Sequence, residues 1–252
     1  MTFEVTGEAY DRFMGRYSRP LAHSLTDWLD VRMGERALDV GCGPGAWTER
    51  LVERLGAERV SAIDPSGPFV EACRARFPGV DVRQGRAEAL PYADDHFDVA
   101  GACLVVHFMA DPVAGIAEMA RVTRPGCWVG ATVWDLAGRR EPMATLWNTL
   151  DDVDPGHPGE GTLPGGAQGQ LVEFMVAAGL QDVEGTEIAV TVTHPTFEEW
   201  WEPYLHAVGP VGEVIAALDD DGRTRLRDEC LHRLGPGPFD LTAVAFAVRG
   251  RA

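Results

Sequence analysis

The fold of this chain is decided by the stretch Ala37-Leu38-Asp39-Val40-Gly41-Cys42-Gly43-Pro44-Gly45-Ala46-Trp47-Thr48. Residues 37–40 predict a short buried strand, and the apolar spacing of residues 48–55 predicts a helix after the glycines. The glycines permit a tight turn and leave the backbone open to a ligand, because glycine carries no Cβ atom. The free N–H groups of the helix point at this turn. Such a turn after a first parallel strand is typical of a nucleotide-cofactor site in a doubly wound sheet.

The glycine pattern by itself leaves the cofactor open. Gly41, Gly43 and Ala46 fit the fingerprint of dinucleotide-binding proteins, and Asp64 supplies the acid expected on the second strand. Asp39 indicates a different ligand, because a carboxylate beside the turn would repel a pyrophosphate but attract a cationic ligand that bears an amino acid. A nicotinamide-dependent oxidoreductase therefore remains an alternative, as does a plain strand, turn and helix without a ligand.

Composition and charge limit the classes of partner. The 252 residues suffice for one large α/β domain, or for a core domain with an insertion. The net charge is −17, and all 22 basic residues are arginine. Such a surface disfavours nucleic-acid and membrane partners. It suits a cationic or neutral substrate, although solubility alone also explains it.

Several expected absences follow from the same sequence. No apolar run approaches the length of a membrane span, and the first residues lack a basic region followed by an apolar stretch. We therefore expect a cytoplasmic protein. The five cysteines are scattered without a C-x-x-C pair, which favours reduced thiols over a disulfide framework. We expect no metal site, because no pair of histidines or cluster of acids has ligand spacing.

Further strands follow at the intervals of an alternating α/β chain. Residues 60–63 predict a second strand that ends at Asp64, and residues 80–84, 96–102 and 127–134 predict the next three. Asp64 lies where an acid can accept hydrogen bonds from two ribose hydroxyls. A carboxylate that caps the next helix is the plainer interpretation of the same residue.

The segments from Asp39 to Thr132 occur in a recognisable order. After the glycine turn come D-P-S at 64–66, G-x-A-E-x-L-P at 85–91, F-D-V, L-x-x-H, and R-P-G before a strand. This order resembles the small-molecule class I S-adenosylmethionine-dependent methyltransferases of the type 11 kind. The resemblance implies an α/β fold with a doubly wound, mostly parallel, Rossmann-like sheet of seven strands in the order 3-2-1-4-5-7-6. The last strand would be antiparallel, and a helical cap would be inserted.

The resemblance also implies S-adenosylmethionine as cofactor and a small molecule as methyl acceptor. The glycine turn would hold the methionine and ribose parts, Asp64 the ribose, and the backbone of Ala87 the adenine ring. The family commonly has an aspartate before that alanine, where this chain has Arg86. The candidate cofactor residues are Tyr10, Tyr17, Arg19, Asp39, Gly41, Gly43, Gly45, Asp64, Pro65, Ala87, Glu88 and Leu104.

Residues 8–29 predict an N-terminal helix, because apolar side chains recur every four residues, although Pro20 implies a break or a new start. We expect residues 1–36 to form a helical lid over the cofactor. In related methyltransferases an arginine on this helix often contacts the methionine carboxylate, and Arg19 is the candidate here. Arg12 or Arg16 could serve instead, and a merely solvated amphipathic helix is the alternative.

The remaining ranges divide into core and cap. We expect the cofactor-binding core at 37–134, 168–194 and 241–252, with substrate-cap insertions at 135–167 and 195–240. The candidate substrate residues are His107, Trp134, Trp200, Trp201 and Tyr204, and His107 is also the candidate catalytic base. A packing or orienting role is the favoured interpretation of His107, and at least one of the two adjacent tryptophans should only pack the cap.

The sequence leaves the methylated atom open, whether oxygen, nitrogen, carbon or sulfur. It also leaves open a catalytically silent member that binds the cofactor as a sensor or scaffold. We expect a monomer or a homodimer.

Overall fold

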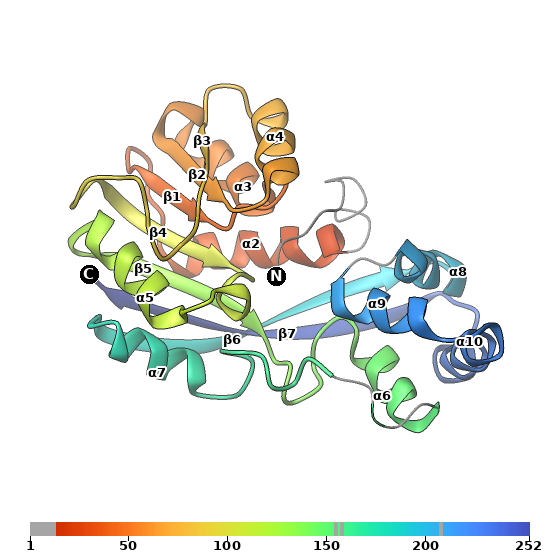
Figure 1. Cartoon of the computed structure of the whole chain (residues 1–252). Coiled ribbons are helices and arrows are strands. Elements are labelled where there is room, and N and C mark those ends of the chain that lie inside the picture. The colour runs from red at the N-terminus through yellow and green to blue at the C-terminus, as the bar shows by residue number, and fades with distance from the viewer. Residues whose placement is uncertain (1–13, 154–155, 157–158, 207–208) are drawn as a thin grey trace.

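The computed structural model describes residues 14–153, 156, 159–206 and 209–252. In this part of the chain, seven strands form one sheet in the order β3-β2-β1-β4-β5-β7-β6 (Figure 1). The strands are β1 (Ala37–Val40), β2 (Val60–Asp64), β3 (Asp81–Gln84), β4 (Phe97–Cys103), β5 (Thr123–Trp134), β6 (Gln181–His194) and β7 (Phe239–Arg251). Strand β7 runs opposite to the other six: it pairs antiparallel with β5 and with β6, and the pairs among β1 to β5 are parallel. The predicted fold class and strand order are confirmed.

Helices cover both faces of the sheet (Figure 1). On one face lie α2 (Arg16–Trp28), α3 (Ala46–Leu55) and α4 (Gly67–Arg76). On the other lie α5 (Pro112–Val122) and α7 (Gln170–Ala177). The alternation of strand side chains explains the two layers, since successive residues point to opposite faces. Ala37 packs with the buried residues of α2 and α3, whereas Leu38 packs with those of α5.

Helix α2 is continuous through Pro20, so the break expected there is wrong. A proline inside a helix removes one backbone hydrogen bond. The loss is offset here because Leu21, Ala22 and Leu25 on the next turns are fully buried. The helix is therefore held by its packing and belongs to the core of the sheet.

Strand β5 begins at Thr123, so Arg124, Pro125 and Gly126 lie inside a strand that was expected to begin at residue 127. Its pairing with β4 shifts register between Phe97 and Val99, which accommodates this irregular start. The N–H of Gly126 donates to the carbonyl of Ala252 at 2.9 Å, so this segment is held by the last residue of the chain.

Strands β6 and β7 extend beyond the parallel strands and carry a lobe of helices at their far end (Figure 1). The lobe consists of α6 (Ala144–Val153), α8 (Phe197–Trp201), α9 (Gly209–Ala217) and α10 (Asp220–Leu234). Three short 3₁₀ helices complete the described elements: η2 (Ala57–Arg59), η3 (Val106–Phe108) and η4 (Glu202–His206). We call residues 135–167 and 195–240 the cap, and their role in holding a substrate stays a prediction. No helix within the described ranges is long and apolar enough to cross a bilayer.

Candidate functional site

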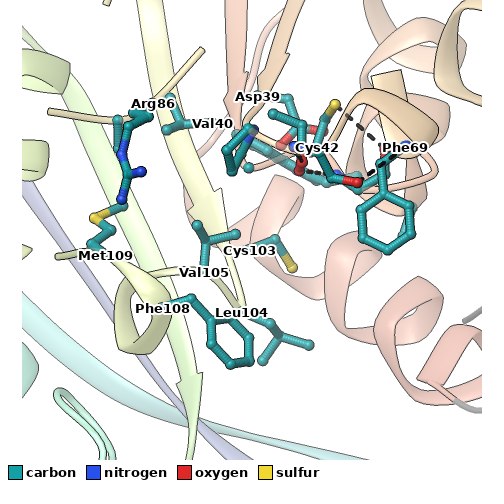
Figure 2. A pocket seen from close by; sticks show the side chains of 18 of the residues that line it. Asp39, Val40, Cys42, Phe69, Arg86, Cys103, Leu104, Val105, Phe108 and Met109 are labelled. Carbon is teal, nitrogen blue, oxygen red and sulfur yellow. Dashed lines mark hydrogen bonds between the residues drawn. The ribbon is translucent and has the colours of Figure 1, made fainter. Parts of the chain in front are cut away.

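A pocket opens at the carboxyl ends of β1, β2 and β4, where the strand order reverses and where doubly wound sheets bind their ligands (Figure 2). Its hollow measures about 1120 Å³ including the open mouth. The lining residues come from the glycine turn, from the ends of the three strands and from the loops after them. They are Ser18, Asp39, Val40, Gly41, Cys42, Gly43, Pro44, Ala46, Trp47, Asp64, Pro65, Ser66, Phe69, Gly85, Arg86, Ala87, Glu88, Cys103, Leu104, Val105, Phe108 and Met109.

The glycine turn is closed by backbone bonds and by close packing. The N–H groups of Gly41 and Cys42 both donate to the carbonyl of Ile63, at 2.7 and 3.1 Å. Gly41 has φ +74°, and a Cβ atom there would overlap the side chain of Val105. Gly43 has φ +53°, yet a Cβ atom there would meet nothing within 4 Å. The turn is thus tight at Gly41 and open toward the pocket at Gly43.

Asp64 is buried at the end of β2 and braces this turn. One carboxylate oxygen accepts the N–H of Gly43 at 2.9 Å, and the other accepts the N–H of Ser66 at 2.8 Å. Burial raises the pKa of Asp64, although these two bonds lower it. Ser66, whose hydroxyl accepts the N–H of Phe69, caps α4, so Asp64 is not the helix cap. Each oxygen of Asp64 keeps lone pairs for a further donor.

Asp39 lies on the other side of the same turn, at the end of β1. Only 1% of its surface is exposed, and Thr48 Oγ1 donates to Asp39 Oδ2 at 2.6 Å. Burial raises the pKa of Asp39 to about 7; the bond from Thr48 lowers it, and the negative charge of Asp64 raises it further. Two buried carboxyl groups therefore flank the glycine turn, an arrangement that favours a cationic ligand.

The opposite wall of the pocket carries Arg86, Ala87 and Glu88. The Arg86 side chain lies beside Met109 (Figure 2), and its Nε is 3.7 Å from Glu88 Oε2. The carboxylate of Glu88 accepts the N–H groups of Ala110 and Asp111 at 2.8 and 3.3 Å. Burial raises the pKa of Glu88, but the residue's own backbone N–H, these two N–H donors and the charge of Arg86 lower it, and the net shift is downward. Glu88 therefore fixes the loop before α5 as well as lining the pocket.

The loop after β4 forms the apolar wall, where Leu104 and Phe108 lie side by side (Figure 2). Leu104 has φ +63°, a left-handed conformation that is costly for a bulky residue. It is held there because its N–H donates to the carbonyl of Thr132 at 3.0 Å and to Thr132 Oγ1 at 3.2 Å. Such local strain is frequent at ligand sites, where the surrounding structure enforces it.

Comparison with known proteins finds similarity over the segment that builds most of this pocket. Residues 38–130 match the family model of the methyltransferase domain. This part of the chain, from β1 into β5, is therefore similar to methyltransferase domains. An uncharacterized methyltransferase of Mycobacterium tuberculosis is 39% identical over 152 residues, which cover 60% of this chain and 54% of that protein. The chain thus spans about half the length of this relative.

Two other proteins match almost the whole chain. The nocamycin O-methyltransferase of Saccharothrix syringae is 29% identical over 278 residues, covering 100% of this chain and 97% of that protein. The phosphoethanolamine N-methyltransferase 2 of Haemonchus contortus, solved in complex with S-adenosyl-L-methionine, superimposes with a TM-score of 0.58 at 15% identity. That superposition covers 97% of this chain and 56% of the nematode protein, and it supports the fold.

Most of the predicted cofactor residues come together in the pocket. Those in its lining are Asp39, Gly41, Gly43, Asp64, Pro65, Ala87, Glu88 and Leu104. Gly45 is not among them. A Cβ atom at Gly45 would overlap the ring of Phe77, the residue after α4, so packing explains this glycine, and its contact with a cofactor stays a prediction.

The N-terminal helix contributes a different residue from those predicted. Arg19 lies outside the pocket lining, with 48% of its side chain exposed and its Nε 3.6 Å from Glu49 Oε2. The hydroxyl of Tyr17 bonds His194 Nε2 at 2.8 Å instead of facing the pocket. Ser18 lines the pocket, and its buried hydroxyl has no hydrogen-bond partner among the described residues. Tyr10 lies outside the described residues.

His107 is buried on η3 beside Phe108, with ring centroids 3.9 Å apart, and is not in the pocket lining. Burial lowers the pKa of His107 to about 3, so the imidazole is neutral at physiological pH. A general base works best with a pKa near the operating pH. The structure therefore supports the packing role of His107 over the catalytic one.

The predicted substrate aromatics are buried in the cap and not in this pocket. Trp200, Trp201 and Tyr204 are each at most 5% exposed, and their rings contact one another. Trp134, at the end of β5, is 3% exposed. The structure thus separates these residues from the cofactor pocket, and their role with a substrate stays a prediction.

Sequence reasoning missed several lining residues. Ser18, Cys42, Phe69, Cys103, Val105, Phe108 and Met109 line the pocket without having been predicted. The last four of these residues could have been predicted. The end of β4 and the residues that follow it must emerge at the same edge of the sheet as the glycine turn. No group of three potential metal ligands occurs within the described ranges.

Proposed function

We propose that this protein transfers a methyl group from S-adenosylmethionine to a small-molecule acceptor. The observation that carries the proposal is the pair of buried carboxyls, Asp39 and Asp64, on either side of an open glycine turn. A dinucleotide would bring its pyrophosphate to this turn, where the carboxyl group of Asp39 would repel it. A ligand with an ammonium and a sulfonium group would instead be attracted.

The residues present fit the proposed cofactor. Asp64 is held by two backbone N–H groups and keeps lone pairs for the two ribose hydroxyls. Asp39 can compensate the positive charge of the amino-acid end. Ala87, Leu104 and Met109 offer an apolar surface to the adenine ring. The side chain before Ala87 is Arg86, so it cannot accept a hydrogen bond from the adenine amino group.

S-adenosylmethionine, when bound, supplies a methyl group on a sulfonium. The neutral thioether released on transfer is already a good leaving group. The chain has to align the acceptor with that methyl group and exclude water. Ideal alignment lowers the free-energy barrier of such a reaction by about 7 kcal/mol or more. Leu104, Val105 and Phe108 form the apolar wall suited to this task. A base is needed only if the acceptor must lose a proton.

The nature of the acceptor follows from charge and from relatives. The net charge of −17 disfavours nucleic acid. The nocamycin O-methyltransferase, 29% identical over nearly its whole length, is named for the O-methylation of a small molecule. We infer that the acceptor of this protein is a small molecule too.

Calorimetric titration tests the cofactor directly. We expect S-adenosylmethionine to bind and NAD not to bind. Asp64→Ala should weaken binding of S-adenosylmethionine by about 1–3 kcal/mol, because two hydroxyls lose their charged acceptor. An unchanged affinity of Asp64→Ala for S-adenosylmethionine would contradict the role of Asp64 in the cofactor site. Tight binding of NAD by the wild type would support the oxidoreductase alternative. Formation of S-adenosylhomocysteine with a metabolite extract separates an enzyme from a catalytically silent binding protein.

A further inference from the structure

Glu141 is buried in the segment between β5 and α6 without any hydrogen-bond partner for its carboxyl group. Its exposed fraction is 3%, and neither Oε1 nor Oε2 has a partner among the described residues. It is not part of the cofactor pocket described above. A buried carboxyl group without a partner is unfavourable, because it gives up its hydration and receives nothing in return.

The charged groups around Glu141 do not supply the missing partner. Arg139 is 3.2 Å from Asp151, and Asp135 is paired with Arg140. The other buried glutamate of the cap, Glu160, accepts the indole N–H of Trp147 at 3.0 Å. Burial raises the pKa of Glu141 to about 7. The residue's own backbone N–H and the charge of Arg139 lower this pKa, and the charges of Glu160 and Asp135 raise it further.

Glu141 lies next to a face of the sheet that carries other unpartnered polar atoms. The carbonyl of Arg140, the residue before it, accepts the N–H of Val244 on β7 at 2.7 Å. The neighbouring residue on β7, Ala245, is the register partner of Trp134. The backbone just before Glu141 is therefore bonded to β7 one residue from the position that pairs with Trp134, whose buried indole N–H also lacks a partner among the described residues.

Register and ring contacts extend this face across the cap. Side chains at every second position of β7 point the same way, so Ala245 and Phe239 share a face, as do their partners Trp134 and His194. Trp200 packs on Phe239 with ring centroids 6.4 Å apart, and its buried indole N–H is again without a partner in the described chain. The charge of Glu141 also acts on Tyr204, which contacts Trp200.

We propose that Glu141, with Trp134 and Trp200, binds the methyl acceptor through hydrogen bonds. The proposal rests on the proposed function, since it names the acceptor site of the same enzyme. A carboxylate accepts hydrogen bonds and repels anions, whereas indole N–H groups donate. The acceptor is therefore a largely aromatic or apolar molecule without negative charge that presents an O–H or N–H group to Glu141. Trp134 is the last residue of β5. The proposed acceptor site therefore lies at the same carboxyl edge of the sheet as the cofactor pocket.

Thermal unfolding of the ligand-free protein tests whether Glu141 is kept for a ligand. The pKa of Glu141 is raised in the folded state. The ionised carboxyl group therefore destabilises the folded protein increasingly as the pH rises from the pKa of the unfolded chain toward about 7. We expect Glu141→Gln to raise Tm by a few degrees at about pH 8.5 and to leave it nearly unchanged at about pH 5. A structural carboxyl group would give a lower Tm at both values, and that result would overturn the proposal.

Binding of matched probes tests the chemistry of the site, with S-adenosylhomocysteine at saturation. The probes are 2-naphthol, 2-naphthylmethylamine and 2-naphthoic acid, measured by calorimetry. We expect the hydroxyl or the amine probe to bind, which tells O–H from N–H recognition, and the acid not to bind. Glu141→Leu should weaken binding of that probe at least about tenfold. Glu160→Gln is the control and should bind it as the wild type does, because Glu160 already has its partner.

The outcomes separate the two proposals. If S-adenosylhomocysteine itself does not bind, the proposed function fails. If it binds but naphthoic acid binds as well as naphthol, or Glu141→Leu keeps the affinity, the acceptor site is wrong. Absence of binding by all three probes to the wild type would also overturn the stated acceptor class.

Discussion

Gly41 and Gly43 lie in the same turn and both have positive φ, but their surroundings differ. A Cβ atom at Gly41 would overlap Val105, whereas one at Gly43 would enter open space. We expect Gly43→Ala to cost about 1 kcal/mol of folding free energy, from backbone strain alone. Gly41→Ala should cost a further 1–3 kcal/mol, roughly the penalty of overpacking. Urea denaturation of both variants measures the difference, and equal losses would contradict the close packing at Gly41.

Asp39 should make cofactor binding depend on pH. Its pKa is raised to about 7, and a cationic ligand binds the ionised form. Below about pH 7 the affinity for S-adenosylmethionine should fall by up to about tenfold per pH unit. Asp39→Asn should bind more weakly at neutral pH and show a flat profile when titrated by calorimetry over the same range. A wild-type profile that stays flat down to about pH 5.5 would show that Asp39 does not face the charge.

The carboxyl group of Asp39 should give the stability of the ligand-free protein the opposite dependence on pH. An acid whose pKa is raised on folding stabilises the protein below its unfolded pKa, and this contribution is lost as the pH rises through the folded pKa. We therefore expect ligand-free Asp39→Asn to unfold at a higher temperature than the wild type above about pH 7. The two proteins should converge in acid. A lower Tm for Asp39→Asn at high pH would contradict the shift.

Residues tied to the backbone of a strand end could be located from the sequence, and residues on a helix face could not. Asp39 and Asp64 follow buried strands, so their place at the edge of the sheet was fixed by chain order. Arg19 and Ser18 are neighbours on one helix, where a rotation of about 100° per residue decides which faces the pocket. That rotation is set by the burial of Leu21 and Leu25, which spacing indicates only approximately.

At the scale of elements, α2 is joined to the cap by a cluster of four side chains. Tyr17 and Arg16 both bond the buried His194, at 2.8 and 3.0 Å, and Arg16 also pairs with Glu199 on α8. His194 ends β6, so the cluster ties the N-terminal helix to the far end of the sheet. The sequence could not show this, because the partners are about 180 residues apart.

Tyr17→Phe tests this junction and separates it from a cofactor contact. The variant leaves His194 Nε2 buried without a partner, and we expect a loss of about 1–3 kcal/mol in urea denaturation. Its affinity for S-adenosylmethionine should stay within about twofold of the wild type. The control is Thr191→Val in an exposed threonine pair, which should change stability by less than about 0.5 kcal/mol. A large loss of cofactor affinity for Tyr17→Phe would restore the lid role predicted for that residue.

At the scale of the whole molecule, the fold was predictable because local patterns and chain order agree. Each strand of the parallel half ends at a turn or loop that the sequence marks, as at Gly41 and Asp64, and the resemblance supplied the order of the last strands. The cap was predictable only as a range of residues. Its interior depends on contacts such as those of Trp200 with Phe239 and of the Arg140 carbonyl with Val244 on β7, which no local spacing encodes.

The net charge of −17 should act on the cofactor beyond the pocket. S-adenosylmethionine carries a sulfonium charge that S-adenosylhomocysteine lacks, so the two ligands differ mainly in their attraction to the acidic protein. Salt screens that attraction, since the Debye length falls to a few ångströms at high ionic strength. We expect the affinity for S-adenosylmethionine to fall severalfold between about 0.05 and about 0.5 M NaCl, and that for S-adenosylhomocysteine to change much less. Calorimetry of both ligands at matched pH gives the two slopes. Equal slopes would mean that Asp39, Asp64 and the acidic surface do not select for the positive charge.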